Sequence, residues 1–406
     1  MAGLPPDGVP GPDDGSLPES AMARLGNAPF GVYVHVPFCQ TRCGYCDFNT
    51  YTATELGSGA SRESYAALAI AELRLAAKVL AGRAGPVQTV FFGGGTPTLL
   101  PPADLTAMLR AIDSELGLAP GAEVTTEANP ETVDERSLAE LRASGFTRIS
   151  LGMQSAVPHV LAVLERVHQP GRPEQCVSWA RSAGFGHVSL DLIYGAPGET
   201  DGDWQTSLDR AIAADPDHIS AYSLIVEEGT RLAARIRRGE LPMPDDDVLA
   251  DRYLIADDRL SAAGFSWYEV SNWAAAADAP CRHNELYWTG GNWWGIGPGA
   301  HSHVGGTRWW NVRHPAAYAQ RVSGSLSPAQ AREVLTESER ATERIMLATR
   351  LASGCPLAYL TPAGLQAART AVEDGLASRA ALELGAVTLT RRGRLLADAV
   401  IRELTD

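Results

Sequence analysis

The segment from Tyr33 to Cys46, which reads YVHVPFCQTRCGYC, decides the fold of this chain. Its first part alternates, with Val34 and Val36 on one face and Tyr33 and His35 on the other, as a β-strand requires. Three cysteines then follow within eight residues. The segment therefore predicts a strand that runs directly into a loop carrying three thiols.

The three cysteines of this loop are spaced as Cys-x3-Cys-x2-Cys at Cys39, Cys43 and Cys46. Four cysteines complete the ligation of an iron–sulfur cube. Three would leave one iron open to a substrate, just as catalytic zinc sites keep one open position. Structural zinc is the alternative, since thiolate-rich sites suit both metals. Zinc needs a fourth ligand, however, and none stands at normal spacing in this loop, so the pattern favours a cluster.

The composition is typical of an ordinary globular protein. Apolar residues make up 45% and charged residues 20% of the 406 residues, and the formal net charge is −14. An acidic chain repels phosphate backbones, so we expect no specific nucleic-acid partner. No apolar run reaches the roughly 18 residues of a membrane span, although peripheral contact with membrane-bound partners stays open. The six cysteines are unlike a disulfide framework, which predicts a reducing, cytoplasmic location.

Short apolar runs alternate with helical segments between residues 30 and 226, and one helical segment, 157–184, is interrupted at Pro170. Such repeats with short connections indicate parallel strands. The predicted fold class is α/β, with the strands forming a partial, TIM-like (β/α)6 barrel or an open sheet. Ligands of either arrangement gather at the carboxyl ends of the strands. The six expected strands are 31–36, 87–92, 123–128, 147–151, 187–193 and 218–225.

Four regions are predicted along the chain. Residues 1–29 are rich in Pro, Gly and Asp and are typical of a flexible leader, and residues 30–226 form the core barrel. Residues 227–329 form an aromatic-rich α+β extension that contains seven of the nine tryptophans. Residues 330–406 form a small helical, winged-helix-like module.

Glycine and polar residues mark the ends of the predicted strands. The second strand ends in GGGTP at 93–97, where glycines let a ligand approach the backbone closely. Glu127 and Gln154 end the third and fourth strands, and Asp191 lies within the apolar fifth strand. A charged carboxyl in such a strand is costly unless it is paired or functional. Tight turns and surface carboxylates are the ordinary alternatives to a ligand pocket here.

With the aromatic residue Tyr45 before its third cysteine, the cysteine pattern resembles the radical SAM superfamily. The resemblance implies a [4Fe–4S] cluster on the three cysteines and S-adenosylmethionine (SAM) on its open iron. It also implies an electron donor that reduces the cluster. The residues that it assigns to SAM are Tyr33, Tyr45, Gly94, Gly95, Thr96, Glu127, Gln154, Arg166 and Asp191.

The wider string from Tyr33 to Asn49 resembles one branch of that superfamily. This branch contains the oxygen-independent coproporphyrinogen III oxidases and the related heme chaperones. The oxidases typically have Cys-x3-Cys-x2-Cys-x-Cys, and Phe48 stands where their last cysteine would be. The difference puts decarboxylation of coproporphyrinogen in doubt and favours the chaperones.

Residues 283–288 read HNELYW and resemble the HNxxYW motif of the heme chaperones. A histidine can be an axial ligand of heme iron, and nearby tryptophans can line a flat apolar pocket. The resemblance implies heme on His283, while Cys281 and His301 are competing candidates. The residues alone favour a structural histidine and tryptophans that belong to the core.

Three functions are compatible with these motifs. The first is a chaperone that carries heme as cargo to client proteins such as respiratory cytochromes, with the cluster and SAM controlling assembly or release. The second is an active oxidase that decarboxylates coproporphyrinogen III. The third is a zinc-stabilised scaffold without redox function. The motifs favour the heme chaperone.

Overall fold

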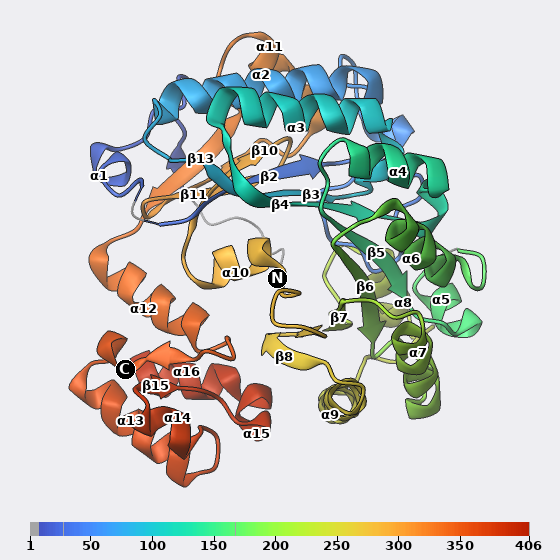
Figure 1. Cartoon of the computed structure of the whole chain (residues 1–406), viewed down its shortest axis with the longest axis vertical. Helices are drawn as coiled ribbons and strands as arrows, with labels where there is room; N and C mark the ends of the chain where they lie inside the picture. Colours follow the sequence, from blue (N-terminus) through green and yellow to red (C-terminus); the bar gives the residue numbers. More distant parts are fainter. Residues whose placement is uncertain (1–7, 27, 167, 406) are drawn as a thin grey trace.

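The computed structural model describes residues 8–26, 28–166 and 168–405. Its centre is a set of six parallel strands that lie side by side in chain order, which confirms the predicted α/β core. Because all six run in the same direction, their carboxyl ends meet at one end of the curved sheet (Figure 1). The strands are β2 (Phe30–Val36), β3 (Val87–Gly94), β4 (Leu118–Ala128), β5 (Arg148–Gln154), β6 (His187–Tyr194) and β7 (His218–Ser223).

Helices connect these strands and cover the outer, convex face of the sheet (Figure 1). In α3, Leu105, Met108, Leu109 and Ile112 are buried at helical spacing and belong to the main core. The covered face leaves the loops at the strand ends as the place for chemistry. The connecting helices are α2 (Arg62–Leu80), α3 (Pro102–Leu116), α4 (Glu135–Ala143), α5 (Pro158–Val163), α6 (Arg172–Ala183) and α7 (Asp201–Ala213).

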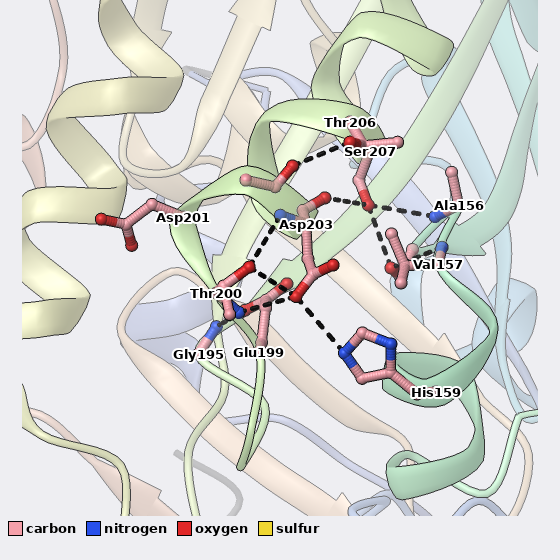
Figure 2. Close-up of polar contacts among 12 residues, drawn as sticks. Ala156, Val157, His159, Gly195, Glu199, Thr200, Asp201, Asp203, Thr206 and Ser207 are labelled. Atoms are coloured by element: carbon pink, nitrogen blue, oxygen red, sulfur yellow. Dashed lines mark hydrogen bonds and ion pairs between the residues drawn. The ribbon is translucent and has the colours of Figure 1, made fainter.

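The start of α7 shows how side chains fix a helix end (Figure 2). The backbone N–H of Asp203 donates to Thr200 Oγ1 at 3.2 Å, and the backbone N–H of Thr200 donates to the Asp203 carboxylate at 2.8 Å. This capping box satisfies two N–H groups that the helix itself leaves unpaired. Ser207 Oγ accepts from the Ala156 N–H at 3.1 Å, which fastens α7 to the segment that follows β5.

The break between α5 and α6 is longer than the single interruption that Pro170 predicts. Residues 164–166 and 168–171 lie outside both helices, and Glu165 has a φ of 52° in the left-handed region. A non-glycine residue rarely adopts this conformation, and its surroundings must hold it there. The result is a loop, rather than a helix, beside the cysteine segment.

The sheet continues past the predicted core on both sides. β10 lies parallel to β2, and all the further strands are antiparallel to their neighbours. The expected boundary between 226 and 227 therefore divides one continuous sheet, and the boundary between 329 and 330 falls inside β13. The added strands are β8 (Ser266–Glu269), β9 (Asn272–Ala274), β10 (Asn292–Ile296), β11 (His301–Val304), β12 (Thr307–Asn311) and β13 (Ala329–Val334).

The prediction of a flexible leader over residues 1–29 is wrong for residues 8–26. There β1 (Val9–Pro10) pairs with β13, and the short helix α1 (Glu19–Met22) follows it. Ala21 and Leu25 are buried, because the leader packs on the antiparallel part of the sheet. The proline and glycine content predicted an irregular backbone. It did not predict that this segment packs on the sheet. Residues 1–7 and 27 lie outside the described residues.

The C-terminal module has a small hydrophobic core of its own, which includes Ile345, Ala368, Val387 and Leu404. Its helices surround a two-stranded sheet. The elements are α12 (Glu337–Ala348), β14 (Cys355–Pro356), α13 (Pro362–Glu373), α14 (Arg379–Glu383), β15 (Ala386–Val387), α15 (Arg391–Leu395) and α16 (Ala397–Thr405).

Four further helices belong to the middle of the chain. α10 lies on the inner, concave side of the sheet, against β2 and β3 (Figure 1). No helix in the described part of the chain is both long and apolar enough to cross a membrane. The four are α8 (Arg231–Arg237), α9 (Asp246–Ala262), α10 (Arg282–Trp288) and α11 (Pro315–Ser323).

Candidate cofactor site

A cavity of about 1470 Å³ lies at the carboxyl ends of β2 to β7 and extends into the concave side of the sheet. It brings together all the residues to which the sequence assigned a cofactor. His301, the competing ligand candidate on β11, is absent from its lining; it is exposed and stacks on Trp310. The predicted residues in the lining are Tyr33, Cys39, Cys43, Tyr45, Cys46, Gly94, Gly95, Thr96, Glu127, Gln154, Arg166, Asp191 and His283.

The cysteine loop follows β2 and is held by backbone hydrogen bonds. The Cys39 N–H donates to Tyr51 O at 3.0 Å, and the Cys46 N–H donates to Cys43 O at 3.3 Å. Burial raises the pKa of the Cys39 thiol, and it raises the pKa of Cys46 to about 11. A metal must therefore displace the protons of Cys39 and Cys46 when it binds.

The loop after α5 clamps this cysteine loop at Gly44. The Gly44 N–H donates to Leu164 O at 3.2 Å, and Gly44 O accepts from the Leu232 N–H at 2.8 Å. Glu165 pairs with Arg231 of α8 at 2.7 Å, and a Cβ on Gly44 would lie 3.0 Å from the Glu165 carboxyl carbon. The cysteine loop is thus hydrogen-bonded to two segments, one after β5 and one after β7.

Two glycines at the end of β3 have no room for a side chain. Gly94 has a φ of 106°, and a Cβ there would lie 2.6 Å from the His35 ring. A Cβ on Gly95 would lie 2.5 Å from Phe38 O. The backbone can therefore approach both the cysteine loop and a ligand in the cavity.

Two carboxyl groups, on β4 and β6 with β5 between them, face the cavity without an ion pair among the described residues. Glu127 accepts from the Gly94 N–H at 3.1 Å, and Asp191 accepts from Ser150 Oγ at 2.9 Å. Burial, and then the charge of Asp191, raise the pKa of Glu127 to about 8. Burial also raises the pKa of Asp191. Such a pair can accept hydrogen bonds from hydroxyls or hold a cationic ligand.

Arg166 reaches from the loop after α5 to the cysteine loop. Its Nη1 donates to Cys43 Sγ at 3.7 Å and its Nη2 to Gly152 O at 3.0 Å. A Cβ on Gly152 would lie 2.8 Å from this guanidinium. Gln154 ends β5 with a φ of 65°. The guanidinium can bind a carboxylate while it stays beside the thiol.

His283 is buried, and its side chain is fully engaged in hydrogen bonds. Its exposed fraction is 1%. Nδ1 lies 2.8 Å from Thr89 Oγ1 and Nε2 lies 2.8 Å from Tyr287 Oη, and the ring stacks on Phe91. Burial lowers the pKa of His283 to about 3. Both ring nitrogens are thus engaged within the protein, so a heme ligand would have to displace Thr89 or Tyr287, and heme on His283 stays a prediction.

Cys281 and the tryptophans are the other parts of the predicted heme pocket. Cys281 lines the cavity but is buried, with its thiol 3.6 Å from Glu123 Oε1 and its pKa raised by burial. Among the described residues, no tryptophan lines the cavity; Trp273, Trp294 and Trp309 lie in the main core. These three tryptophans therefore contribute to the core and not to the wall of the cavity.

Comparison with known proteins places the chain in a family. A profile of the radical SAM superfamily matches residues 33–211. The heme chaperone HemW of Mycobacterium tuberculosis is 53% identical over 94% of this chain and 96% of its own length. The chain belongs to the HemW family. The HemW of Bacillus subtilis is 32% identical, over 91% of this chain and 97% of the relative.

A solved structure shares the HemW fold of this chain. Coproporphyrinogen III oxidase (HemN) from Escherichia coli, described as a radical SAM enzyme, matches with a TM-score of 0.80 and 21% identity. The match covers 97% of this chain and 94% of that chain. At this identity the likeness concerns the fold alone, including the extension and the C-terminal module.

Sequence reasoning missed several residues of this HemW cavity. Arg148 is 1% exposed; it pairs with Glu123 at 3.0 Å and donates to Pro280 O at 3.0 Å. Arg148 could have been found from the sequence in the way Asp191 was, because both are charged residues within an apolar strand. His168 and His218 also line the cavity, and nothing in their local sequence distinguishes them.

Proposed function

We propose that this protein is a heme chaperone that binds heme in the cavity and passes it to client proteins. A [4Fe–4S] cluster on Cys39, Cys43 and Cys46, with SAM beside it, would control loading or release. The observation that carries the proposal is the convergence of three thiols and two unpaired carboxyl groups on one cavity. The HemW relatives, which are named heme chaperones, support the same function.

The donor set suits an iron–sulfur cluster. Three thiolates fall one short of the four ligands of a structural zinc ion, whereas a four-iron cluster can be held by three. Three ligands leave a fourth iron open. When bound, this cluster supplies the electron with which radical SAM proteins split the carbon–sulfur bond of SAM.

The surrounding residues suit the separate parts of SAM. Gly94 and Gly95 leave the backbone open to the methionine part, and Arg166 can take its carboxylate. Glu127 and Asp191 can accept from the ribose hydroxyls or hold the ammonium group. Tyr33, Tyr45, Thr96 and Gln154 complete this part of the lining.

The size of the cavity supports a second ligand. Sites for one small molecule typically measure about 300–1,000 Å³, and this cavity measures about 1470 Å³. The cluster and SAM occupy the part beside β2 to β6 in this proposal. The remainder is open to a flat cargo such as heme.

The test is anaerobic reconstitution followed by parallel assays of heme transfer and porphyrinogen decarboxylation. We expect iron and sulfide to bind, hemin to bind, and the hemin to pass to an apo-hemoprotein acceptor. The Cys43→Ala variant should lose the cluster, while Cys355→Ala, in the C-terminal core, should keep it. Formation of protoporphyrinogen from coproporphyrinogen III would establish the oxidase instead. One zinc ion in place of iron and sulfide would contradict both functions.

A further inference from the structure

Three histidines line the cavity, and they differ in what their ring nitrogens already contact. His283 has both nitrogens engaged, by Thr89 and Tyr287. His218 lies at the start of β7, away from the strand ends, where it is buried and its Nε2 is 2.9 Å from Tyr268 Oη. His283 cannot bind a ligand without breaking these contacts, and the other nitrogen of His218, Nδ1, is buried at the opposite end of the strand from the cavity mouth.

His168 lies in the loop between α5 and α6, beside the cysteine loop, and is only half-buried. Its Nδ1 is buried without a hydrogen-bond partner, and its Nε2 makes no hydrogen bond among the described residues, so Nε2 is the nitrogen open to a ligand. The loop is held on both sides of it, because the Gln169 N–H donates to Glu131 Oε1 at 2.8 Å and Arg166 binds Gly152. His168 therefore presents an available imidazole from an anchored backbone.

The state of this imidazole suits iron. Burial, and then the positive charge of Arg166, lower the pKa of His168 below its usual value. A neutral ring keeps the lone pair that a metal takes, and histidine is the commonest axial ligand of heme. Of the three histidines, His168 alone is only half-buried, lies at the strand ends and has neither ring nitrogen engaged by a described residue.

Apolar side chains in the lining are unusually exposed. Phe48, in the cysteine loop, is 60% exposed, and Ile225, just after β7, is 54% exposed. Tyr45 and Val226, from the same two segments, belong to one hydrophobic cluster, so these segments meet. Large apolar side chains left open beside a cavity mark a binding surface, and a porphyrin macrocycle is a flat apolar ligand that would cover them.

We propose that His168 is the axial ligand of the carried heme and that Phe48 and Ile225 cover the apolar edge of its porphyrin. This inference rests on the proposed heme-carrying function and names the place of the cargo within the cavity. Heme would then sit at the mouth, from which it can leave for a client. It would not sit deep beneath SAM, against α10.

The test is titration of the reconstituted full chain with ferric hemin, followed by Soret absorbance and resonance Raman spectra. We expect His168→Ala to weaken binding by about 10- to 100-fold, the usual effect of disturbing a metal's ligand sphere, and to lose the iron–imidazole stretching signal. Added imidazole should restore the Soret position. The matched control is His159→Ala, on an exposed histidine that pairs with Asp203 outside the cavity (Figure 2).

The outcomes separate the two proposals. If the unaltered chain does not bind hemin, the proposed function fails. If it binds hemin and His168→Ala leaves affinity and spectrum unchanged, only the assignment of His168 is overturned, and His218→Ala and His283→Ala then locate the ligand. Phe48→Ser should weaken hemin binding several-fold without changing the Raman signal, and equal affinity would remove Phe48 from the binding surface.

Discussion

The helix α10 and the mouth of the cavity lie on the same concave side of the sheet. They differ in whether their polar groups are hydrogen-bonded and their apolar groups buried. Around α10, the His283 N–H donates to Glu123 and the His283 ring contacts Tyr287, in a closed set of hydrogen bonds. At the mouth, His168 keeps a nitrogen without a partner among the described residues and Phe48 stays exposed. Satisfied groups stabilise a fold, whereas unsatisfied ones are available to a ligand.

This difference shows that a motif and a binding site are not the same. The HNELYW segment packs on the concave side of the sheet against β2 and β3, and Thr89 and Tyr287 engage the ring of His283. His168 and Phe48 are the more accessible side chains of the cavity. The expected effects of substitution therefore divide between stability around α10 and ligand binding at the mouth.

The largest expected effect comes from the buried ion pair that anchors α10. Arg148→Met removes the partner of Glu123 and leaves a buried carboxylate unpaired, which costs about 3–5 kcal/mol of unfolding free energy. Denaturant unfolding measures it. The control is Arg136→Met, which removes an exposed pair with Glu140 and should cost about 0.5 kcal/mol or less. Equal losses of unfolding free energy in the two variants would show that the buried ion pair contributes no more to stability than the exposed one.

His283→Ala comes next, because it leaves Thr89 and Tyr287 without their partner. We expect a loss of about 2–4 kcal/mol in unfolding free energy, measured by the same method. Hemin affinity, measured at a temperature where the variant is folded, should stay unchanged. A stable variant with weakened hemin binding would return the ligand role to His283 and reverse the comparison.

The third prediction concerns pH and SAM. Glu127 binds a cationic or hydroxyl-bearing ligand best when ionised, and its pKa is raised to about 8 by burial and by Asp191. SAM affinity should therefore rise from pH 6 to pH 8, by up to about tenfold per unit for one proton, and then level off. Calorimetry on reconstituted protein measures the profile. Glu127→Gln should flatten it, while Glu115→Gln, at the surface, should not.

The smallest expected effect is on the clamp over the cysteine loop. Arg231 pairs with Glu165, but its side chain is more than half exposed, so Arg231→Ala should cost about 1 kcal/mol or less. The measurable consequence is faster loss of the cluster absorbance in air. Arg237→Ala, on the same helix, is the control. Identical decay rates in the two variants would show that the clamp does not protect the site.

The sequence predicted the core sheet and the gathering of cofactor residues, since parallel strands in chain order bring their carboxyl ends together wherever they occur. The places of Glu127 and Asp191 in their strands were enough to locate both carboxyl groups at the cavity. The partners of His283 could not be predicted, because Thr89 and Tyr287 approach it only through the packing of α10 on β3. The leader was missed for the same reason: Val9 pairs with Arg332 at the far end of the chain, and composition contains no information on such pairing.

The docked leader has a consequence for handling the protein. β13 would otherwise offer a row of free N–H and C=O groups at the sheet margin, and such margins recruit the margins of other molecules. The segment from 8 to 26 shields part of this row and buries Ala21 against Gly305. A shortened chain that begins at Phe30 would keep all the residues that line the cavity but would expose the edge of β13. We expect it to self-associate increasingly as its concentration rises.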